Sequence, residues 1–280
     1  MQKGSARLVD DNEIERFLHE DIGAKDLTAE IIPETKLAIA TVIAREAVVV
    51  CGQAWFSAVF RFLDSSSQVS WDVSDGEEIT ANTRLCTVNG NARALLSGER
   101  TALNFLQTLS STATLSRRYY KAVYGTNAIV LDTRKTIPGL RCAQKYAVRC
   151  GGCSNHRFGL FDGILIKENH IAAAGSIRNA VAMARSAHSG ISVEVEVECL
   201  QELEQALAAG ADRILLDNFD LDGLHRAVSV NNAAAELEAS GNVNLSNIRE
   251  IASTGVNYIS VGALTKNIQA ADLSMTMELI

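Results

Sequence analysis

The residues Val193-Glu194-Val195-Glu196-Val197 alternate strictly between apolar and acidic side chains. Successive side chains of a β-strand point to opposite faces of a sheet, so this stretch predicts a strand with one apolar face and one carboxylate-bearing face. Further short apolar stretches predict strands before and after it along the chain: residues 128–133, 164–167, 213–216, 234–239 and 258–261. We therefore expect six strands in the second half of the chain.

Segments with helical periodicity separate most of these strands: residues 141–149, 177–187, 200–209 and 246–253. Short apolar strands that alternate with helices are typical of parallel βαβ units with right-handed crossovers. Six such units in a row with no reversal signal favour a closed α/β barrel over an open doubly wound sheet. The pattern therefore predicts an α/β fold with a barrel in its C-terminal part.

The first part of the chain has a different pattern. A short helix is expected over residues 13–19 and a long helix over residues 95–120. Apolar stretches separated by polar turns lie between the two helices: residues 38–44, 48–51 and 69–73. We expect a mixed domain over residues 1–112, with residues 268–280 as a candidate addition, and a barrel domain over residues 113–267.

The composition is that of an ordinary globular protein of 280 residues, with 47% hydrophobic and 21% charged residues. The net charge of −7 argues against nucleic acid as a general partner, because nucleic-acid-binding proteins carry a basic surface. No apolar segment resembles a signal peptide, and the most apolar region, residues 37–51, is interrupted by Arg45 and Glu46. The six cysteines are scattered, as in proteins with reduced thiols. We expect a cytoplasmic protein that does not bind a membrane.

Charged residues occur at strand ends that a barrel would bring together. They comprise four cations and two carboxylates: Arg134, Lys135, Arg157, Lys167, Glu196 and Asp217. Taken singly, a charged residue at a strand end is more often a solvated edge than a catalytic group. Together, these guanidinium and ammonium groups predict a site for a polyanion, because they match carboxylate and phosphate oxygens. The two carboxylates suit Mg²⁺ held with a substrate diphosphate, since Mg²⁺ prefers oxygen ligands.

Small residues follow the last two predicted strands. Ser240-Gly241 and Gly262-Ala263 bring backbone N–H groups to the loops before the next helices. This arrangement favours a phosphate cradle, which many barrels form with their last two strands. The alternative is that both pairs are simply tight turns.

Two other motifs favour structural roles. Cys150 and Cys153 form a Cys-x-x-Cys motif with His156 nearby, but no second half-site follows at the spacing of a metal centre. Arg141, Lys145 and Arg149 recur at i, i+4 and i+8, which predicts one solvated face of a helix.

Four motifs, taken in order, closely resemble the quinolinate phosphoribosyltransferase family over almost the whole chain. They are Gly98-Glu-Arg-Thr-Ala-Leu-Asn-Phe105, Asp132-Thr-Arg-Lys-Thr136, Asn155-His-Arg157 and Ile166-Lys-Glu-Asn-His170. The resemblance implies a partial α/β barrel preceded by an N-terminal α/β sandwich. It also implies a homodimer in which the N-terminal domain of one subunit covers the barrel mouth of the other.

The resemblance further implies a reaction and a role for each site residue. Quinolinate and phosphoribosyl pyrophosphate would give nicotinate mononucleotide, pyrophosphate and carbon dioxide, in NAD synthesis. The residues that match quinolinate ligands in such relatives are Arg100 (from the neighbouring subunit), Arg134, His156, Arg157 and Lys167. Lys135 matches a ligand of phosphoribosyl pyrophosphate, and Glu196 and Asp217 match carboxylates near the ribose and Mg²⁺. The cradle of the 5′-phosphate matches Ser240, Gly241 and Gly262.

One departure from the family pattern concerns the loop before Asn155. Cys153 stands where relatives commonly have a third glycine, and a side chain restricts positive φ angles. We therefore expect this loop to be shaped differently from that of relatives, with a small effect on the placement of His156.

Two other functions remain open on the residues alone. A class I aldolase-like barrel would use Lys167 to form a Schiff base, which borohydride would trap. A non-catalytic protein that binds an anion or a nucleotide would bind its ligand without turnover, and it would leave Glu196 and Asp217 without a role.

Overall fold

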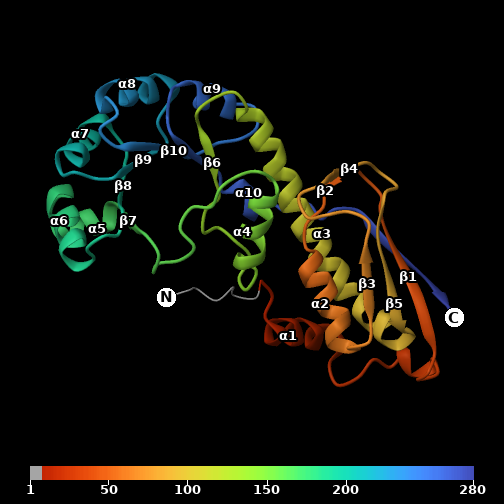
Figure 1. The fold of residues 1–280 in the computed structure, drawn as a ribbon. Helices are drawn as coiled ribbons and strands as arrows, with labels where there is room; N and C mark the ends of the chain where they lie inside the picture. The colour runs from red at the N-terminus through yellow and green to blue at the C-terminus, as the bar shows by residue number, and fades with distance from the viewer. Residues whose placement is uncertain (1–7) are drawn as a thin grey trace. The chain divides into compact units, whose positions relative to one another are not determined.

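The computed structural model describes residues 8–280, which form two compact units (Figure 1). One unit consists of the chain up to Thr114 together with Ile268–Ile280, and the other consists of Leu115–Asn267. Helix α3 (Ala92–Val123) begins in the first unit and ends in the second. Among the described residues, no helix combines the length and the apolar character that crossing a membrane would require.

The first unit is built on a four-stranded antiparallel sheet in the order β12-β1-β5-β3. Its strands are β1 (Leu37–Ala44), β3 (Gln68–Trp71), β5 (Arg84–Asn91) and β12 (Leu273–Leu279). Along β1 every second residue is a buried alanine or valine, so one face of the sheet is apolar. The strand from the C-terminal end of the chain, β12, pairs with β1 over seven residue pairs.

Helices and a small ladder complete the first unit. Its other elements are α1 (Asp11–Ile22), the 3-10 turn η1 (Ala29–Ile31), β2 (Val48–Val49), α2 (Gln53–Leu63) and β4 (Glu78–Ile79). Helix α1 is capped by Asp10, whose carboxylate accepts the N–H of Asn12 at 3.0 Å. Helix α2 buries Trp55, Phe56 and Phe60. The sequence pattern did not predict α2, because its apolar residues are nearly continuous rather than periodic.

The second unit contains six parallel strands in the order β6-β11-β10-β9-β8-β7. They are β6 (Ile129–Leu131), β7 (Ile164–Ile166), β8 (Val193–Val197), β9 (Arg213–Asp217), β10 (Glu236–Ser240) and β11 (Tyr258–Ser260). The intervening helices are α4 (Arg141–Cys150), α5 (Glu168–Ala174), α6 (Ile177–Ala187), α7 (Leu200–Ala208), α8 (Leu221–Asn231), α9 (Ile248–Ser253) and α10 (Ala263–Lys266). In Figure 1 helices α6 to α9 follow the outer side of the strands.

This sheet is a partial barrel. Its first strand, β6, pairs with its last, β11, as in a barrel, but β6 and β7 do not pair within the described residues. The closed barrel favoured by the strand–helix pattern is therefore wrong at this one position, and the partial barrel that the family resemblance implies is confirmed. Residue Ser154 takes the place beside β6 instead: its N–H donates to Val130 O at 2.9 Å and its O accepts the N–H of Asp132 at 3.1 Å.

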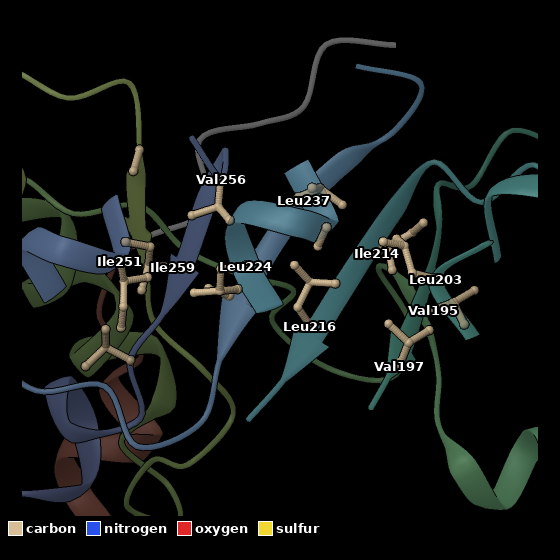
Figure 2. Packing of buried hydrophobic residues seen from close by; sticks show 14 of the residues in the cluster. Val195, Val197, Leu203, Ile214, Leu216, Leu224, Leu237, Ile251, Val256 and Ile259 are labelled. Carbon is tan, nitrogen blue, oxygen red and sulfur yellow. The ribbon is translucent and has the colours of Figure 1, made fainter. Parts of the chain in front are cut away.

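The alternation along β8 divides the unit into an apolar face and a polar face. Val193, Val195 and Val197 are buried and pack with Leu203 of α7 and Leu224 of α8 in one hydrophobic cluster (Figure 2). Fully burying such a side chain contributes about 1.5–3 kcal/mol. Since successive side chains alternate, the glutamates of β8 occupy the opposite face. The strand predicted from this alternation is confirmed residue for residue.

Helices α5 and α8 were not predicted from the sequence. Helix α8 contains Gly223, Val228 and Val230, which are weak helix formers, so its local signal is poor. Helix α5 starts directly after β7 within a polar segment that has few apolar residues to mark a helical period. Packing rather than local preference determines these two helices.

Candidate active site

The C-terminal ends of the six parallel strands lie along one edge of the sheet, which is where α/β barrels place their active sites. Lys167 follows β7, Glu196 lies in β8, and Asp217 ends β9. Arg134 and Lys135 follow β6 within four residues of its end. We call the six charged side chains that the sequence predicts at this edge the mouth residues: Arg134, Lys135, Arg157, Lys167, Glu196 and Asp217.

Lys167 and Glu196 form an ion pair across the adjacent strands β7 and β8, in which Lys167 Nζ donates to Glu196 Oε2. The lysine side chain is 42% exposed and the glutamate side chain 13% exposed. The backbone holds the lysine as the N-cap of α5, since its N–H donates to His170 Nδ1 at 2.9 Å. The ammonium group is therefore fixed at its base and open to solvent at its tip.

Lys135 lies against a glycine of the neighbouring strand end. A Cβ atom added at Gly262 would lie 3.1 Å from Lys135 Cδ, so the lysine side chain passes close over this glycine. The loop itself is held by two hydrogen bonds: Lys135 N–H donates to Thr133 Oγ1 at 3.1 Å, and Thr265 Oγ1 donates to Lys135 O at 2.8 Å. The structure thus brings together Lys135 and Gly262, two residues that the sequence predicts for the phosphate site.

Arg157 is half-buried, and its guanidinium group donates to Gly163 O at 3.0 Å. Burial lowers the pKa of Arg157, and the positive charge of Arg134 lowers it further. The two guanidinium groups repel each other and together create a positive potential. An anion bound between them would reduce this repulsion. This pair is therefore suited to a substrate with carboxylate groups.

Asp217, Ser240 and Gly241 lie together at the ends of β9 and β10. Asp217 and Ser240 are partners in the register of the two strands, and Asn218 N–H donates to Ser240 O at 2.9 Å. Gly241 has φ +96°, and a Cβ atom there would lie 2.9 Å from the backbone nitrogen of Asn218. Only glycine fits this close approach of two backbones, which is the geometry that an anion cradle requires.

His156 faces two buried glutamates, Glu194 and Glu238. Its Nε2 is 3.0 Å from Glu194 Oε2 and 3.6 Å from Glu238 Oε1, and its Nδ1 accepts the N–H of Arg157 at 2.7 Å. Burial lowers the pKa of His156, but the bond to Glu194 and the charge of Glu238 raise it, and the net shift is upward. Burial raises the pKa of Glu238 to about 7, with the charge of Glu194 as the next cause.

Lys145 is a buried residue whose role the sequence pattern missed. Its Nζ forms an ion pair with Asp132 and donates to His156 O at 3.0 Å. Asp132 also accepts hydrogen bonds from Asn155 Nδ2 at 2.6 Å and from His156 N at 3.0 Å. The prediction of a solvated helix face is therefore wrong for Lys145. Asp132 was the sequence feature that could have indicated a buried lysine, since a carboxylate next to a buried strand needs a charged or hydrogen-bonding partner.

The other two members of the predicted helix face also have partners. Arg149 is exposed and donates to Asn155 Oδ1 at 2.6 Å. Arg141 is half-buried and donates to Thr136 Oγ1 at 3.0 Å and to Phe158 O at 3.2 Å. All three cations of the stripe therefore contact loops next to the mouth residues.

Cys153 is buried, and its thiol donates to Ser116 O at 3.2 Å. Among the described residues of this loop, the positive φ angle belongs to Gly152 (φ +98°) and not to Cys153. The concern that Cys153 occupies a position that requires glycine is therefore not realised. Burial raises the pKa of the Cys153 thiol to about 12, so it is protonated at neutral pH.

Arg100, the remaining predicted ligand, lies in the first unit. It is exposed on α3. Its predicted role is in the site of a neighbouring subunit.

A partial parallel barrel with cations, carboxylates and glycine turns at its C-terminal edge is typical of the phosphate-binding α/β-barrel enzymes. Comparison with known proteins gives the particular family. The profile of the quinolinate phosphoribosyl transferase N-terminal domain matches residues 26–110, and that of the C-terminal domain matches residues 112–276. The chain belongs to the quinolinate phosphoribosyl transferase family.

Individual relatives agree with this assignment. The chain is 39% identical over 274 residues to the nicotinate-nucleotide pyrophosphorylase (carboxylating) of Mycobacterium leprae, covering 94% of this chain and 95% of that protein. The solved structure of the nicotinate-nucleotide pyrophosphorylase from Francisella tularensis is 46% identical, with a TM-score of 0.92 and coverage of 98% of this chain and 100% of that one. The structure from Ehrlichia chaffeensis is 35% identical, with a TM-score of 0.92 and coverage of 99% and 100%. The resemblance inferred from the sequence motifs is confirmed.

Proposed function

We propose that the mouth residues form the site at which quinolinate reacts with phosphoribosyl pyrophosphate. In this reaction the pyridine nitrogen attacks the anomeric carbon, pyrophosphate leaves, and the new pyridinium ring accepts the electron pair released as the adjacent carboxylate departs as carbon dioxide. The observation that carries the proposal is the gathering of cations at one edge of the sheet in a protein of net charge −7. Such a local excess suits substrates that carry carboxylate and phosphate groups.

The two carboxylates of quinolinate would be held by Arg134, Arg157 and Lys167. Lys167 is paired with Glu196 in the free chain, so a substrate carboxylate would replace one anionic partner with another. The repulsion between Arg134 and Arg157 would be relieved at the same time. Fixing both carboxylates aims the ring nitrogen, and such positioning lowers the barrier of a two-substrate reaction.

The phosphate groups would be held by Lys135 and by the glycine turns. Lys135 passes over Gly262, and Ser240-Gly241 presents its backbone at the next strand end. A lysine ammonium group and backbone N–H groups are the donors that phosphate oxygens require. Lys135 would stabilise the charge that develops on the departing pyrophosphate.

Glu196 and Asp217 would hold Mg²⁺. Their donor atoms are all carboxylate oxygens at the ends of neighbouring strands, which fits the preference of Mg²⁺. When bound, the ion would supply positive charge near the substrate diphosphate. Loss of activity in excess EDTA and its return with Mg²⁺ are the expected results. Full activity in EDTA would exclude this role.

The aldolase-like alternative fits the site poorly. A Schiff base requires an amine that is available to attack a carbonyl, whereas Lys167 Nζ is engaged as a donor to Glu196 Oε2. Family membership also argues against a protein that binds an anion or a nucleotide without turnover, since the family is one of pentosyltransferases.

The direct test of the proposal is release of pyrophosphate from phosphoribosyl pyrophosphate in the presence of quinolinate. We expect release to require both substrates, and to fall in Arg157→Ala. Arg178→Ala, which removes an exposed arginine from α6, is the matched control and should leave release unchanged. Equal rates in the two variants would exclude Arg157 from the site.

We further propose that the protein acts as a homodimer in which Arg100 completes the site of the neighbouring subunit. Arg100 is exposed on α3, as a residue that reaches across an interface must be before assembly. Arg100→Ala and Lys167→Ala should each be nearly inactive alone. After subunit exchange, heterodimers would contain one intact site, so activity should return to about a quarter of wild type for random pairing in a two-fold dimer. Exchange shown by mass tagging without recovery of activity would contradict the shared site.

We also propose that the protein works in the cytoplasm. The six cysteines all lie in the described part of the chain and form no disulfide there, which suits a reducing compartment. Activity that appears in the membrane or secreted fraction of the cells that make the protein, and not in the cytosolic fraction, would contradict this.

A further inference from the structure

We infer that Thr265 and Gln144 are positioning residues that hold Lys135 over the Gly262 turn, where the phosphate groups of the substrate would bind. This inference rests on the proposed role of Lys135 in binding phosphoribosyl pyrophosphate. It concerns two buried polar side chains that the proposed reaction does not itself use.

Lys135 depends on its backbone for its position. The residue is exposed, and its ammonium group forms no hydrogen bond or ion pair within residues 8–280. Its Nζ lies 3.9 Å from the place where a Cβ atom of Gly262 would be, so the charge is close to the turn. A long lysine side chain with no partner has many rotamers available. The place of its charge is therefore set mainly by where its backbone is fixed.

Thr265 fixes this backbone. The residue is fully buried, and its Oγ1 donates to Lys135 O at 2.8 Å. Thr265 also belongs to α10, the helix that has Gly262 as its N-cap, and its N–H donates to Gly262 O at 3.3 Å. One residue thus binds both the backbone of the lysine and the turn beneath the lysine side chain. It thereby sets the position of the lysine relative to the turn.

Gln144 of α4 holds Thr265 in turn, and α4 and α10 pack against each other (Figure 1). Gln144 is fully buried and uses both ends of its amide: Nε2 donates to Thr265 O at 2.9 Å, and Oε1 accepts the N–H of Ile137 at 2.8 Å. The two partners fix the orientation of the amide, because a carbonyl oxygen only accepts and an N–H group only donates. Since moving a buried amide away from its partners is costly, Gln144 ties α10 to the loop that contains Lys135.

The neighbouring mouth residue Arg134 is held by other contacts. Its O accepts the N–H of Thr136 at 2.9 Å and Arg141 Nη2 at 3.4 Å. The hydroxyl group of Thr265 donates instead to Lys135 O. We therefore expect loss of this hydroxyl group to affect phosphoribosyl pyrophosphate and to spare quinolinate.

Steady-state kinetics with each substrate varied in turn tests this expectation. Thr265→Val removes the hydroxyl group and keeps the branched shape. It should raise KM for phosphoribosyl pyrophosphate about threefold to tenfold, the effect of losing one neutral hydrogen bond, and leave KM for quinolinate unchanged. Thr265→Ser keeps the hydroxyl group and loses the methyl group, so it should have the wild-type KM for both substrates. Normal KM values in Thr265→Val would overturn the inference.

Thr254→Val is the matched control. It removes another buried hydroxyl group of the second unit, one that donates to Ile251 O at 2.7 Å. It should lower the thermal stability and leave both KM values unchanged. A rise in KM for phosphoribosyl pyrophosphate in Thr254→Val or Thr265→Ser, equal to that in Thr265→Val, would overturn the inference. Such a result would mean that KM follows stability and not the hydroxyl group of Thr265.

A double-mutant cycle shows whether Thr265 acts through the lysine. In a Lys135→Met background, Thr265→Val should cause little further rise in KM for phosphoribosyl pyrophosphate. Effects that multiply in the double variant would overturn the inference, because Thr265 would then act on the substrate independently of Lys135.

Should Thr265→Val fail to fold, Gln144→Met takes its place, since it removes the contact that holds Thr265. The same rise in KM for phosphoribosyl pyrophosphate is expected, and a normal value would overturn the inference. The two possible failures are distinguishable. Normal KM in Lys135→Met would contradict the proposed function, whereas a raised KM in Lys135→Met with a normal KM in Thr265→Val would contradict only the positioning role.

Discussion

The second unit contains two lysine–carboxylate pairs that differ in burial and in the role we propose for them. In the inner pair, Lys145 and Asp132 have side chains that are 2% and 0% exposed. In the mouth pair, Lys167 and Glu196 are 42% and 13% exposed. The chemical groups are nearly the same, so burial and surrounding hydrogen bonds determine what each pair does.

The inner pair holds the backbone in place. Asp132 accepts hydrogen bonds from Lys145, from the side chain of Asn155 and from the N–H of His156, which ties the residues beside β6 to that strand. Removing a charge from water is costly unless every charged oxygen is paired, and here three donors meet the carboxylate. The pair thereby anchors the segment that contains Ser154, the residue that takes the place beside β6.

The mouth pair is suited to exchange. Because the Lys167 side chain is partly in water, the proposed substrate carboxylate would replace Glu196 at modest cost. Lys145 lacks this freedom. We therefore expect the inner pair to contribute to stability and the mouth pair to contribute to turnover.

The largest expected effect is on stability when the inner pair is broken. Lys145→Met should lower the free energy of unfolding by about 3–5 kcal/mol, since it leaves a buried carboxylate without its cation. The matched variant Lys167→Met should change it by no more than about 1 kcal/mol. Both tryptophans, Trp55 and Trp71, lie in the first unit, so urea unfolding should be followed by circular dichroism. Equal losses in the two variants would contradict the comparison.

The loss in Lys145→Met should also depend on pH. Burial raises the pKa of Asp132, and removal of Lys145 takes away the group that most opposes this shift. A carboxyl group with a raised pKa in the folded state binds its proton more tightly when folded. It therefore adds stability at low pH, and this contribution is lost as the pH rises through the raised pKa. The difference from wild type should be largest at neutral pH and should shrink toward pH 4, and a pH-independent difference would exclude Asp132 as its source.

The next largest effect is on turnover when the mouth pair is broken. Lys167→Ala should lower kcat/KM for quinolinate about tenfold to a hundredfold, because one charge-assisted contact of about 1.5–3 kcal/mol is lost. Steady-state kinetics with each substrate varied in turn would show whether the loss falls on quinolinate. A larger loss with phosphoribosyl pyrophosphate would place Lys167 on the other substrate.

Replacing both members of the inner pair sharpens its role further. A buried ion pair that acts alone can often be replaced by apolar residues without loss. Lys145→Met combined with Asp132→Leu should still lose about 1–3 kcal/mol, because the donors of Asn155 and His156 would then lack an acceptor. Wild-type stability of the double variant, measured by the same urea titration, would show that the pair does not hold the 154–157 segment.

The smallest expected effect concerns Cys153. Cys153→Gly should cost about 0.5–1 kcal/mol through the added backbone freedom of glycine, with little change in kcat/KM, since the positive φ angle lies at Gly152. Thermal unfolding and the pyrophosphate assay measure the two quantities. A large gain in activity would show that the cysteine distorts the loop before His156.

The same contrast explains what could be predicted from the sequence. Lys167, Glu196 and Asp217 lie in or directly after short apolar strands that are visible in the sequence, so the edge at which they lie could be located. The burial of Lys145 could not be predicted. A lysine four residues after Arg141 and four residues before Arg149 has the same local pattern whether it faces solvent or a carboxylate. Its direction depends on Asp132, thirteen residues earlier, and on the fold that brings the two together.

The strand–helix pattern, unlike the family resemblance, missed the gap between β6 and β7 for a similar reason. The sequence shows six strands and their helices, but register and closure depend on contacts between distant residues. Ser154 lies in a loop by every local signal, yet it hydrogen-bonds to β6 as a strand would. Glu194 and Glu238 illustrate the same limit, since their shared partner His156 belongs to a different segment of the chain.

The pairing of β12 with β1 has a consequence for how the protein is made. During synthesis β1 emerges early, but its partner at residues 273–279 is translated only after the entire second unit. Until then one edge of the nascent sheet has unsatisfied N–H and C=O groups that can join another chain. Chains released from ribosomes that stall within the second unit would therefore have an exposed, aggregation-prone edge strand. Chaperones that cover such edges would act on this protein late in its translation.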